Sequence, residues 1–400
     1  MTDVSRNAAP IAVAGGGIGG LACALGLAQR GFRAVVLEQA REFGEVGAGL
    51  QMAPNALHVL DALGVGAHAK KNLFLIERMV MRDGLTGEEI VNIPCGAEFC
   101  ARFGNPYAVA HRADIHGALL DGCRSSARIE LRTSCRVKGF DIGDRGVSVA
   151  LDSGERIEAL ALVGADGVHS RIRQLIVNDG EPVASGAVIY RAVIPAGEMP
   201  KDQQKPHPTL WAGPNTHIIY YPVRDWTVFN FGGTVVTGQT TADETGDALP
   251  DEVLRLFARN CDAPLRVMRI PRRFRRYLIR YREPVENWSA GPVTLLGDAA
   301  HPMVQYIAQG AAMALEDAIC LAVAADECGG DLPAAFQRYQ AIRGVRTARV
   351  QISSLMMDRI YHAAGVARLV RNSIFEGRTP AEHYERLSWL YTAPPYVKAL

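Results

Sequence analysis

The sequence predicts a mixed α/β fold with a parallel sheet, an inserted sheet that is mostly antiparallel, and helices at the end of the chain. Three observations lead to this prediction. A strand, a glycine-rich turn, a helix and a second strand follow one another near the amino terminus. A late apolar strand runs into a Gly-Asp pair and a helix of small residues. The chain between these segments alternates in the way that strands do.

The amino-terminal turn has the glycine spacing of a dinucleotide-binding site. Residues 11–14 form a short apolar run, typical of a buried parallel strand, and helical spacing follows the turn. Between the two, Gly15, Gly17 and Gly20 occupy the G-x-G-x-x-G positions. The three glycines allow a tight turn, a close approach of backbone to a pyrophosphate, and close packing of helix on strand.

A second strand and an acid complete this pattern. Residues 33–37 read as the strand, and Glu38 follows them eighteen residues past Gly20, where an acid bonds the ribose hydroxyls of an adenosine. In this order the elements favour a Rossmann-like nucleotide-binding domain over a merely glycine-rich turn. The glycine pattern occurs once and no C-x-x-C pair is present, so one nucleotide is expected to stay bound.

Residues 295–318 are the most informative segment late in the chain. Their buried strand ends at Asp298, which places a carboxylate at the carboxyl edge of the sheet, where open α/β folds bind ligands. A helix of small residues then begins at Gly310 and Ala311, and its bare N–H groups favour a negatively charged partner. The alternative is an ordinary strand-loop-helix connection with a solvated aspartate.

Composition and charge exclude several classes of partner. Lysine and arginine (43) almost cancel aspartate and glutamate (42), so no global charge attracts nucleic acid or a membrane surface, and a small-molecule partner is expected. The eight cysteines are scattered, which fits a reduced, cytoplasmic protein, and no metal site is predicted. Residues 11–29 are uncharged, but six of these nineteen are glycine, so they predict neither an export signal nor a membrane span.

Three segments occur in a diagnostic order: GGGIGG at residues 15–20, ALVGADGVHSRIR at 161–173, and LLGDAAHP at 295–302. In that order they resemble the fingerprints of the single-component FAD-dependent aromatic hydroxylases, the group that contains para-hydroxybenzoate, salicylate and 3-hydroxybenzoate hydroxylases. The resemblance spans residues 11–317. It implies a tightly but non-covalently bound FAD, with NADH or NADPH as a transient co-substrate alongside O2 and a small aromatic acid.

The resemblance implies roles for residues that would hold FAD. Asp298 would bond the ribityl or pyrophosphate part, and the helix start at Gly310 and Ala311 would face the pyrimidine edge of the flavin, which becomes anionic on reduction. Asp166 is like the family's residue that supports both FAD and the nicotinamide cofactor. A strand followed by a capped helix is the plainer interpretation of that segment, and the two are compatible.

Two further contacts to FAD are implied upstream. Gln51, in the loop of residues 47–51, resembles the family's residue beside the flavin ring. Arg112 matches the arginine that contacts the FAD chain. A surface arginine that pairs with Asp114 is the alternative at that position.

Closer similarity is to 3-hydroxybenzoate 6-hydroxylases, through residues 43–65, 103–120 and 213–222. It implies a phenolic aromatic acid as substrate, with attack para to the hydroxyl giving 2,5-dihydroxybenzoate (gentisate). Because the oxygen delivered from the flavin is electrophilic, the ring must be electron-rich, and a phenolate is richer than a phenol. The alternatives are a salicylate or 6-hydroxynicotinate hydroxylase on the same frame, a non-oxygenating FAD oxidoreductase, and a flavin-binding sensor.

The candidate for removing the phenol proton is His217. Residues 216–221 alternate as a strand does, which places His217 and Tyr221 on one face. A histidine on such a face is ordinarily a satisfied structural residue. The resemblance implies instead that His217 accepts the proton, that Gln305 contacts the phenolic oxygen, and that Tyr221 lies near the substrate carboxylate. The chain departs from commoner family patterns at residues that could line or back the pocket: Met303, Ile307, Ala312 and Met313.

The rest of the chain is expected to form the inserted sheet and the carboxyl-terminal helices. Strands are predicted at residues 188–194, 209–211, 217–222 and 227–234, with an added edge from 79–93. The expected division is an FAD-binding domain (1–75, 105–178 and 276–345), a substrate-binding sheet domain (76–104 and 179–275), and a carboxyl-terminal helical segment (346–400). The helices after residue 333 either make a homodimer contact or brace the FAD-binding domain.

Eight arginines lie between residues 266 and 282. The near-neutral total charge and the acidic segment 243–252 favour local pairing on a solvated or interdomain face. A guide for the anionic nicotinamide cofactor and a nucleic-acid patch are the alternatives.

Overall fold

A six-stranded sheet forms one half of the molecule. The computed structural model describes residues 9–44, 49–224, 226–240 and 245–399. The strand order is β19-β20-β12-β1-β2-β8, and every pair is parallel except β19 with β20. The mixed α/β fold and the parallel sheet predicted from the sequence are confirmed. The strands are β1 (Ile11–Ala14), β2 (Ala34–Leu37), β8 (Ile129–Arg132), β12 (Ala161–Gly164), β19 (Ser289–Ala290) and β20 (Val293–Leu295).

Helices of small residues cover this sheet. The first crossover helix, α2 (Ile18–Gln29), packs between α6 (Arg112–Arg124) and α10 (Gly310–Glu327). A Cβ atom placed on Gly26 of α2 would lie 3.1 Å from the Cβ of Ala322 in α10, so the two helices approach too closely for larger side chains. The low side-chain volume of both helices therefore allows them to pack closely together over the six-stranded sheet.

The second half is an eight-stranded sheet with the order β17-β18-β13-β16-β15-β14-β5-β6. Only the β14–β5 pair is parallel, and β6 is an edge strand, as predicted for residues 79–93. The strands predicted from alternation are all present. They are β5 (Arg78–Asp83), β6 (Glu89–Pro94), β13 (Val183–Pro195), β14 (Thr209–Gly213), β15 (Thr216–Val223), β16 (Val228–Gln239), β17 (Thr245–Ala248) and β18 (Phe274–Tyr281).

The arginine-rich segment is part of this sheet. β18 pairs with β13, so the domain boundary expected at residue 276 falls inside a strand, and residues 276–281 lie with the eight-stranded sheet. The arginines pair locally: Arg273 and Arg275 contact Asp247 of β17 at 2.8 and 3.3 Å. Arg269, Arg272, Arg273 and Arg275 are exposed, so much of the segment's charge lies at the surface.

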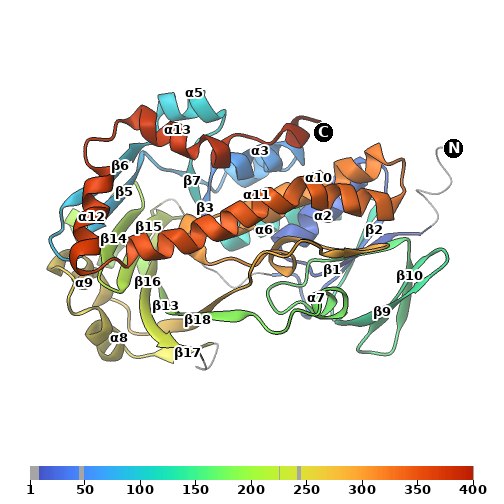
Figure 1. Cartoon of the computed structure of the whole chain (residues 1–400), viewed down its shortest axis with the longest axis horizontal. Coiled ribbons are helices and arrows are strands. Elements are labelled where there is room, and N and C mark those ends of the chain that lie inside the picture. Colours follow the sequence, from blue (N-terminus) through green and yellow to red (C-terminus); the bar gives the residue numbers. More distant parts are fainter. Residues whose placement is uncertain (1–8, 45–48, 225, 241–244, 400) are drawn as a thin grey trace.

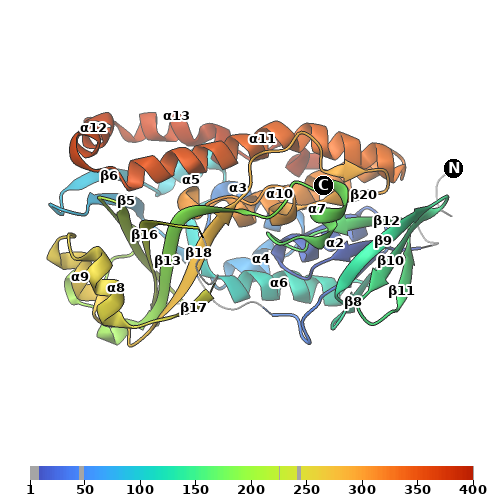
Figure 2. The same cartoon turned by 60° about the horizontal axis from the view of Figure 1, so that its bottom comes forward.

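The two faces of the eight-stranded sheet differ in what covers them (Figure 2). Helices α8 (Pro250–Phe257) and α9 (Asp262–Met268) pack on the outer face, where Phe257 joins a core with Ile218 and Phe231. The opposite, inner face is turned toward the first half of the molecule, because Tyr221 belongs to the same hydrophobic core as the six-stranded sheet. The inner face is therefore where a ligand shared by the two halves would lie.

Two small sheets and several short helices complete these halves. The strands of the first sheet are β9 (Val137–Gly143), β10 (Gly146–Leu151) and β11 (Arg156–Ala159), and those of the second are β3 (Gly49–Met52), β4 (Phe74–Leu75) and β7 (Ala108–His111). The remaining short helices are α3 (Pro54–Ala62), α4 (Gly66–Lys70), α5 (Ala97–Phe103), α7 (Arg171–Ile176), η1 (Ala196–Glu198), η2 (Lys201–Gln203), η3 (Gly297–Ala299) and η4 (Gln305–Ile307).

The carboxyl-terminal helices bridge both halves. The long helix α11 (Leu332–Tyr361) runs along the molecule from the six-stranded to the eight-stranded sheet (Figure 1), so the boundary expected at residue 346 lies within one helix. It is followed by α12 (Gly365–Phe375), α13 (Pro380–Tyr391) and η5 (Pro395–Ala399). None of the helices in the described part of the chain is both long and apolar enough to cross a membrane.

Candidate active site

The glycine turn between β1 and α2 has no room for side chains. Gly15 has a φ of +112°, and a Cβ atom there would lie 2.3 Å from the carbonyl oxygen of Ala165. A Cβ atom on Gly20 would lie 2.0 Å from the carbonyl oxygen of Gly15. Gly17 caps α2 without a side-chain hydrogen bond, so backbone N–H groups at the helix start are available to phosphate oxygens. These features fit a dinucleotide.

Two side chains form hydrogen bonds to the backbone of the same turn. The Glu38 carboxylate accepts hydrogen bonds from the N–H groups of Gly16 and Ala40, each at 2.8 Å. The buried ring of His116 lies 2.8 Å, through Nε2, from the Gly16 carbonyl oxygen. Glu38 thus directly follows β2 and lies beside the glycine turn, where the sequence predicts it. His116 was missed, because nothing in its local pattern shows a contact one hundred residues away.

The late acid and the late helix start come together. Asp298 is exposed in η3, and a Cβ atom on Gly310 would lie 3.8 Å from its Oδ1 atom. Helix α10 begins at Gly310 and Ala311 with no side-chain cap. The predicted juxtaposition of a carboxylate with a bare helix amino terminus is therefore present, and their contacts to FAD stay proposals.

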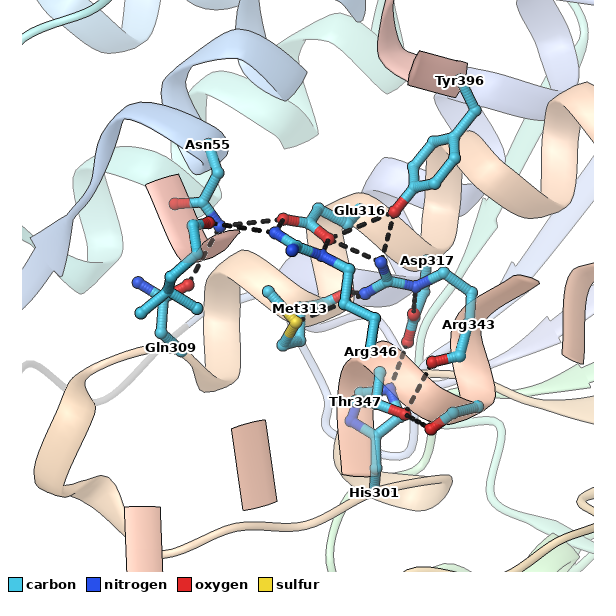
Figure 3. Close-up of polar contacts among 12 residues, drawn as sticks. Asn55, His301, Gln309, Met313, Glu316, Asp317, Arg343, Arg346, Thr347 and Tyr396 are labelled. Atoms are coloured by element: carbon cyan, nitrogen blue, oxygen red, sulfur yellow. Dashed lines mark hydrogen bonds and ion pairs between the residues drawn. The ribbon is translucent and has the colours of Figure 1, made fainter. Parts of the chain in front are cut away.

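A buried ion network lies beneath this corner (Figure 3). It consists of Glu316, Asp317, Arg343 and Arg346. Asp317 accepts a hydrogen bond from the Gly297 N–H at 3.0 Å and pairs with Arg343 Nε at 2.6 Å. Its other strong contact, at 2.6 Å, is to Nε2 of His301. The network therefore fixes the loop that carries Asp298.

The same network fixes the start of α10. Glu316 pairs with Arg343 at 2.5 Å and with Arg346 at 2.7 Å, and it accepts a hydrogen bond from Asn55 Nδ2 at 2.8 Å. Asn55 also donates to Gln309, at the cap of α10, at 2.9 Å. Burial alone would raise the pKa of Glu316, but the arginines outweigh it and hold the pKa below its usual range.

This network was not predicted from the sequence, because charged side chains in a helix are ordinarily solvated. The available signal was the acidic pair Glu316 and Asp317 within a helix otherwise made of small apolar residues. Met313, one of the residues that could line or back the pocket, places its sulfur 3.4 Å from Arg343 Nη2. That side chain therefore faces the network.

Two of the other predicted residues, Gln51 and Asp166, are hydrogen-bonded within the protein, and the position of a third, Arg112, is known. The Gln51 side chain on β3 accepts a hydrogen bond from the Tyr107 hydroxyl at 2.8 Å. Residues 47 and 48 of the same loop lie outside the described residues. Arg112 is the first residue of α6, beside β3. Asp166 accepts the backbone N–H of Arg171 at 2.7 Å and so caps α7, as the plainer interpretation predicted.

On the inner face, His217 and Gln305 meet across Thr234. His217 of β15 is opposite Thr234 of β16, so their side chains share one face. Gln305, from η4, donates through Nε2 to the Thr234 hydroxyl at 3.2 Å. The two residues implied for the phenolic oxygen are thus brought together although they are far apart in sequence.

A partly buried cation lies on the same face. Arg191 of β13 is opposite Gly232, which is opposite Ile219 of β15, so these positions form one row. Arg191 donates through Nη2 to the Gln305 side-chain oxygen at 3.2 Å. Its pKa is lowered by burial, and the neighbouring ring of Tyr221 acts in the opposite direction. An arginine stays protonated under these conditions, so it presents a positive charge to the face.

Gly232 leaves the centre of this row without a side chain. A Cβ atom there would lie 3.4 Å from Ile189 and 3.6 Å from Ile219, which are ordinary contacts. Tyr221 closes the end of the face that lies toward the first half, because a Cβ atom on Gly49 would lie 2.7 Å from its hydroxyl. The row therefore carries the Arg191 guanidinium beside a position that has no side chain. Arg191 and Gly232 were both missed from the sequence.

Comparison with known proteins identifies the family. A model described as "FAD binding domain" matches residues 8–349. The chain is 44% identical over 382 residues to "3-hydroxybenzoate 6-hydroxylase" of Polaromonas naphthalenivorans, covering 96% of this chain and 95% of that one. The chain belongs to the family of FAD-dependent aromatic hydroxylases. The resemblance stated from three motifs is thereby confirmed, and FAD is the cofactor of this flavoprotein.

Other matches agree with this membership. The flavoprotein is 43% identical over 387 residues to "3-hydroxybenzoate 6-hydroxylase 1" of Aquipseudomonas alcaligenes, covering 95% of this chain and 97% of the relative. Its fold matches a crystal structure of Klebsiella pneumoniae HpxO complexed with FAD and uric acid, with a TM-score of 0.83, 24% identity, and coverage of 97% and 98%. The nucleotide-binding half with an inserted sheet is thus the fold of FAD-dependent enzymes.

Proposed function

We propose that this flavoprotein is an NADH- or NADPH-dependent monooxygenase that hydroxylates 3-hydroxybenzoate to 2,5-dihydroxybenzoate. One observation carries the proposal. The inner face presents Arg191, whose charge meets no carboxylate in the described part of the chain, close to the pair His217 and Gln305. These groups suit a ring that carries one carboxylate and one hydroxyl. The names of the relatives that are 43–44% identical support the same substrate.

The roles proposed for FAD follow from the first half of the molecule. The glycine turn and Glu38 would hold the adenosine and pyrophosphate, and Asp298 would bond the chain that leads to the flavin. The start of α10 would face the flavin's pyrimidine edge, with Gln51 and Arg112 beside the cofactor and Asp166 supporting it. Bound FAD supplies the electrophilic oxygen. The protein's own part is to exclude water, orient the acid and remove the phenol proton.

On the inner face, the proposed roles concern the substrate. Arg191 pairs with the carboxylate, Tyr221 lies beside it, and Gln305 contacts the phenolic oxygen. His217 accepts the phenol proton, because free phenols titrate near 10, about as tyrosine does. Without that step the ring stays too electron-poor for rapid attack at neutral pH.

The test is oxygen uptake by the purified flavoprotein with 3-hydroxybenzoate and each reduced nicotinamide, with the products identified. We expect one 2,5-dihydroxybenzoate per O2 consumed. Hydroxylation only of salicylate or 6-hydroxynicotinate would move the substrate assignment within the family. Substrate oxidation without oxygen incorporation would overturn it in favour of a non-oxygenating oxidoreductase.

We also propose a homodimer and a cytoplasmic location. Large apolar side chains are exposed on successive turns of α11 and α12, where a second copy of the chain would cover them. All eight cysteines are free thiols, which suits a reducing compartment. Light scattering of the wild type and of Leu369→Lys tests the dimer, since a charge in the patch should yield monomers. The exposed residues are Ile342, Val345, Ile352, Met356, Val366, Leu369, Val370 and Ile374.

A further inference from the structure

A chain of hydrogen bonds leads from the inner face toward the surface. His217 Nδ1 lies 2.8 Å from His362 Nε2, and His362 Nδ1 lies 2.9 Å from the Asp358 carboxylate. The first two side chains are buried, whereas the Asp358 side chain is 35% exposed. The carbonyl oxygen of His362 accepts a hydrogen bond from Asn215 at 3.0 Å, which fixes the second ring against the sheet. This chain of hydrogen bonds therefore has one buried end, at His217, and one solvent-exposed end, at Asp358.

The direction of the hydrogen bonds follows from their ends. An ionised carboxylate only accepts, so His362 donates through Nδ1 and its Nε2 atom is an acceptor. His217 must then donate through Nδ1, which leaves its Nε2 atom as the acceptor. The hydrogen bond that joins the two rings uses Nδ1 of His217, on the other side of the ring from Nε2. The arrangement thus prepares His217 to receive a proton on the atom that is not bonded to His362.

We infer that His217, His362 and Asp358 form a proton relay that carries the hydroxyl proton of the bound substrate from the inner face to solvent; this inference rests on the proposed function. The substrate O–H bond breaks and an N–H bond forms at His217 Nε2. The Nδ1 proton of His217 passes to His362 Nε2, and the Nδ1 proton of His362 passes to the Asp358 carboxylate and then to water. The phenolate stays bound, and each histidine returns to its starting tautomer by rotation or by the reverse proton shift.

The surroundings explain why a relay is needed. Burial, together with His362, holds the pKa of His217 well below its usual range, so a lasting imidazolium at that position is unfavourable. The groups that face the relay are Tyr306 of η4 and, from α11, Tyr361 and Arg359. None of these supplies a negative charge at neutral pH. Asp358 does supply a negative charge, and it lies at the solvent-exposed end of the relay. The positive charge of the proton is therefore stabilised only after the proton has moved outward.

The decisive measurement is proton release when ligand binds to the FAD-loaded protein, followed with a pH indicator in weak buffer by stopped flow. The wild type should release close to one proton with 3-hydroxybenzoate and none with benzoate, which has no hydroxyl. In His362→Gln the amide can accept from His217 but cannot pass a proton on, so release should slow at least tenfold while benzoate binds normally. Asp358→Asn should slow release in the same way, and Asp358→Glu should restore it.

Controls separate the relay from general damage. Asp331→Asn removes a carboxylate that caps the other end of α11, and it should leave proton release unchanged. In turnover, the relay variants should lower kcat roughly 10²-fold and shift its acid limb to higher pH, with KM little changed. Wild-type release rates in His362→Gln and Asp358→Asn, with 3-hydroxybenzoate still hydroxylated, would overturn the relay alone. A wild type that neither binds nor converts 3-hydroxybenzoate would overturn the proposed function.

Discussion

The buried ion network offers the sharpest test of how this flavoprotein holds its cofactor corner, through the substitution Arg343→Met. Arg343 pairs with Glu316 at 2.5 Å and with Asp317 at 2.6 Å, and all three side chains are 0% exposed. Removing one partner of a buried pair leaves an uncompensated charge, which costs about 3–5 kcal/mol. Arg346 and His301 remain beside the two carboxylates, so we expect a loss within that range and not twice it.

Urea unfolding at a fixed excess of FAD measures this loss, with Arg338→Met as the matched control. Arg338 lies on the same helix and pairs with Glu327 at 2.6 Å, but its side chain is 53% exposed. An exposed pair contributes only about 0–1 kcal/mol. Equal losses in the two variants would refute the reasoning, because they would mean that burial does not decide the strength of these pairs.

The same variant predicts a change in the pH dependence of stability. In the wild type the pKa values of Glu316 and Asp317 lie below their ordinary values, so their contribution is present above the unfolded pKa and lost as the pH falls through the folded one. Without Arg343, burial pushes both pKa values upward. The stability gap between variant and wild type should therefore narrow as the pH falls from about 7 to about 5. A gap that widens would contradict this.

Two further predictions concern the inner face. Gly232→Val should raise the KM for 3-hydroxybenzoate at least tenfold with FAD binding unchanged, because the methyl groups of the valine would lie beside Ile219. Gly232→Ala should have only a small effect on the KM. Equal effects of the two substitutions in steady-state kinetics would show that Gly232 makes no room for substrate. Arg191→Met should weaken binding of 3-hydroxybenzoate by roughly 1.5–3 kcal/mol, the range for a hydrogen bond to a charged group, and leave 3-hydroxybenzyl alcohol unaffected. Calorimetry of both ligands checks this, and equal losses would argue against a carboxylate contact.

The elements that the sequence predicted are those whose signal is local. The β1–α2–β2 unit is specified by apolar runs and by Gly15 and Gly20, whose side-chain-free positions a short pattern can reveal. The alternation of residues 216–221 likewise located β15 and the face shared by His217 and Tyr221. In each case the residues that determine the structure lie within a few positions of one another.

The residues that were missed depend on contacts over long distances along the chain. His362 is 145 positions from His217, and Arg343 is 27 positions from Glu316 in a different helix. Neither residue stands out by type or spacing, because a histidine after a helix and an arginine within one are both ordinary on a surface. Only the packing of α11 across both halves turns them into buried partners.

Charge balance separates the structural polar cluster from the functional one. In the buried ion network, two carboxylates face two guanidinium groups, so the charges cancel within the protein and nothing is left for a ligand. On the inner face, Arg191 has neutral neighbours in Gln305 and Tyr221, and no carboxylate pairs with it in the described part of the chain. A partly buried charge without a counter-charge is unfavourable, so an anionic ligand gains a stabilising interaction that a neutral ligand of the same shape does not. The ratio of their affinities therefore measures directly how much of substrate selection comes from this one arginine.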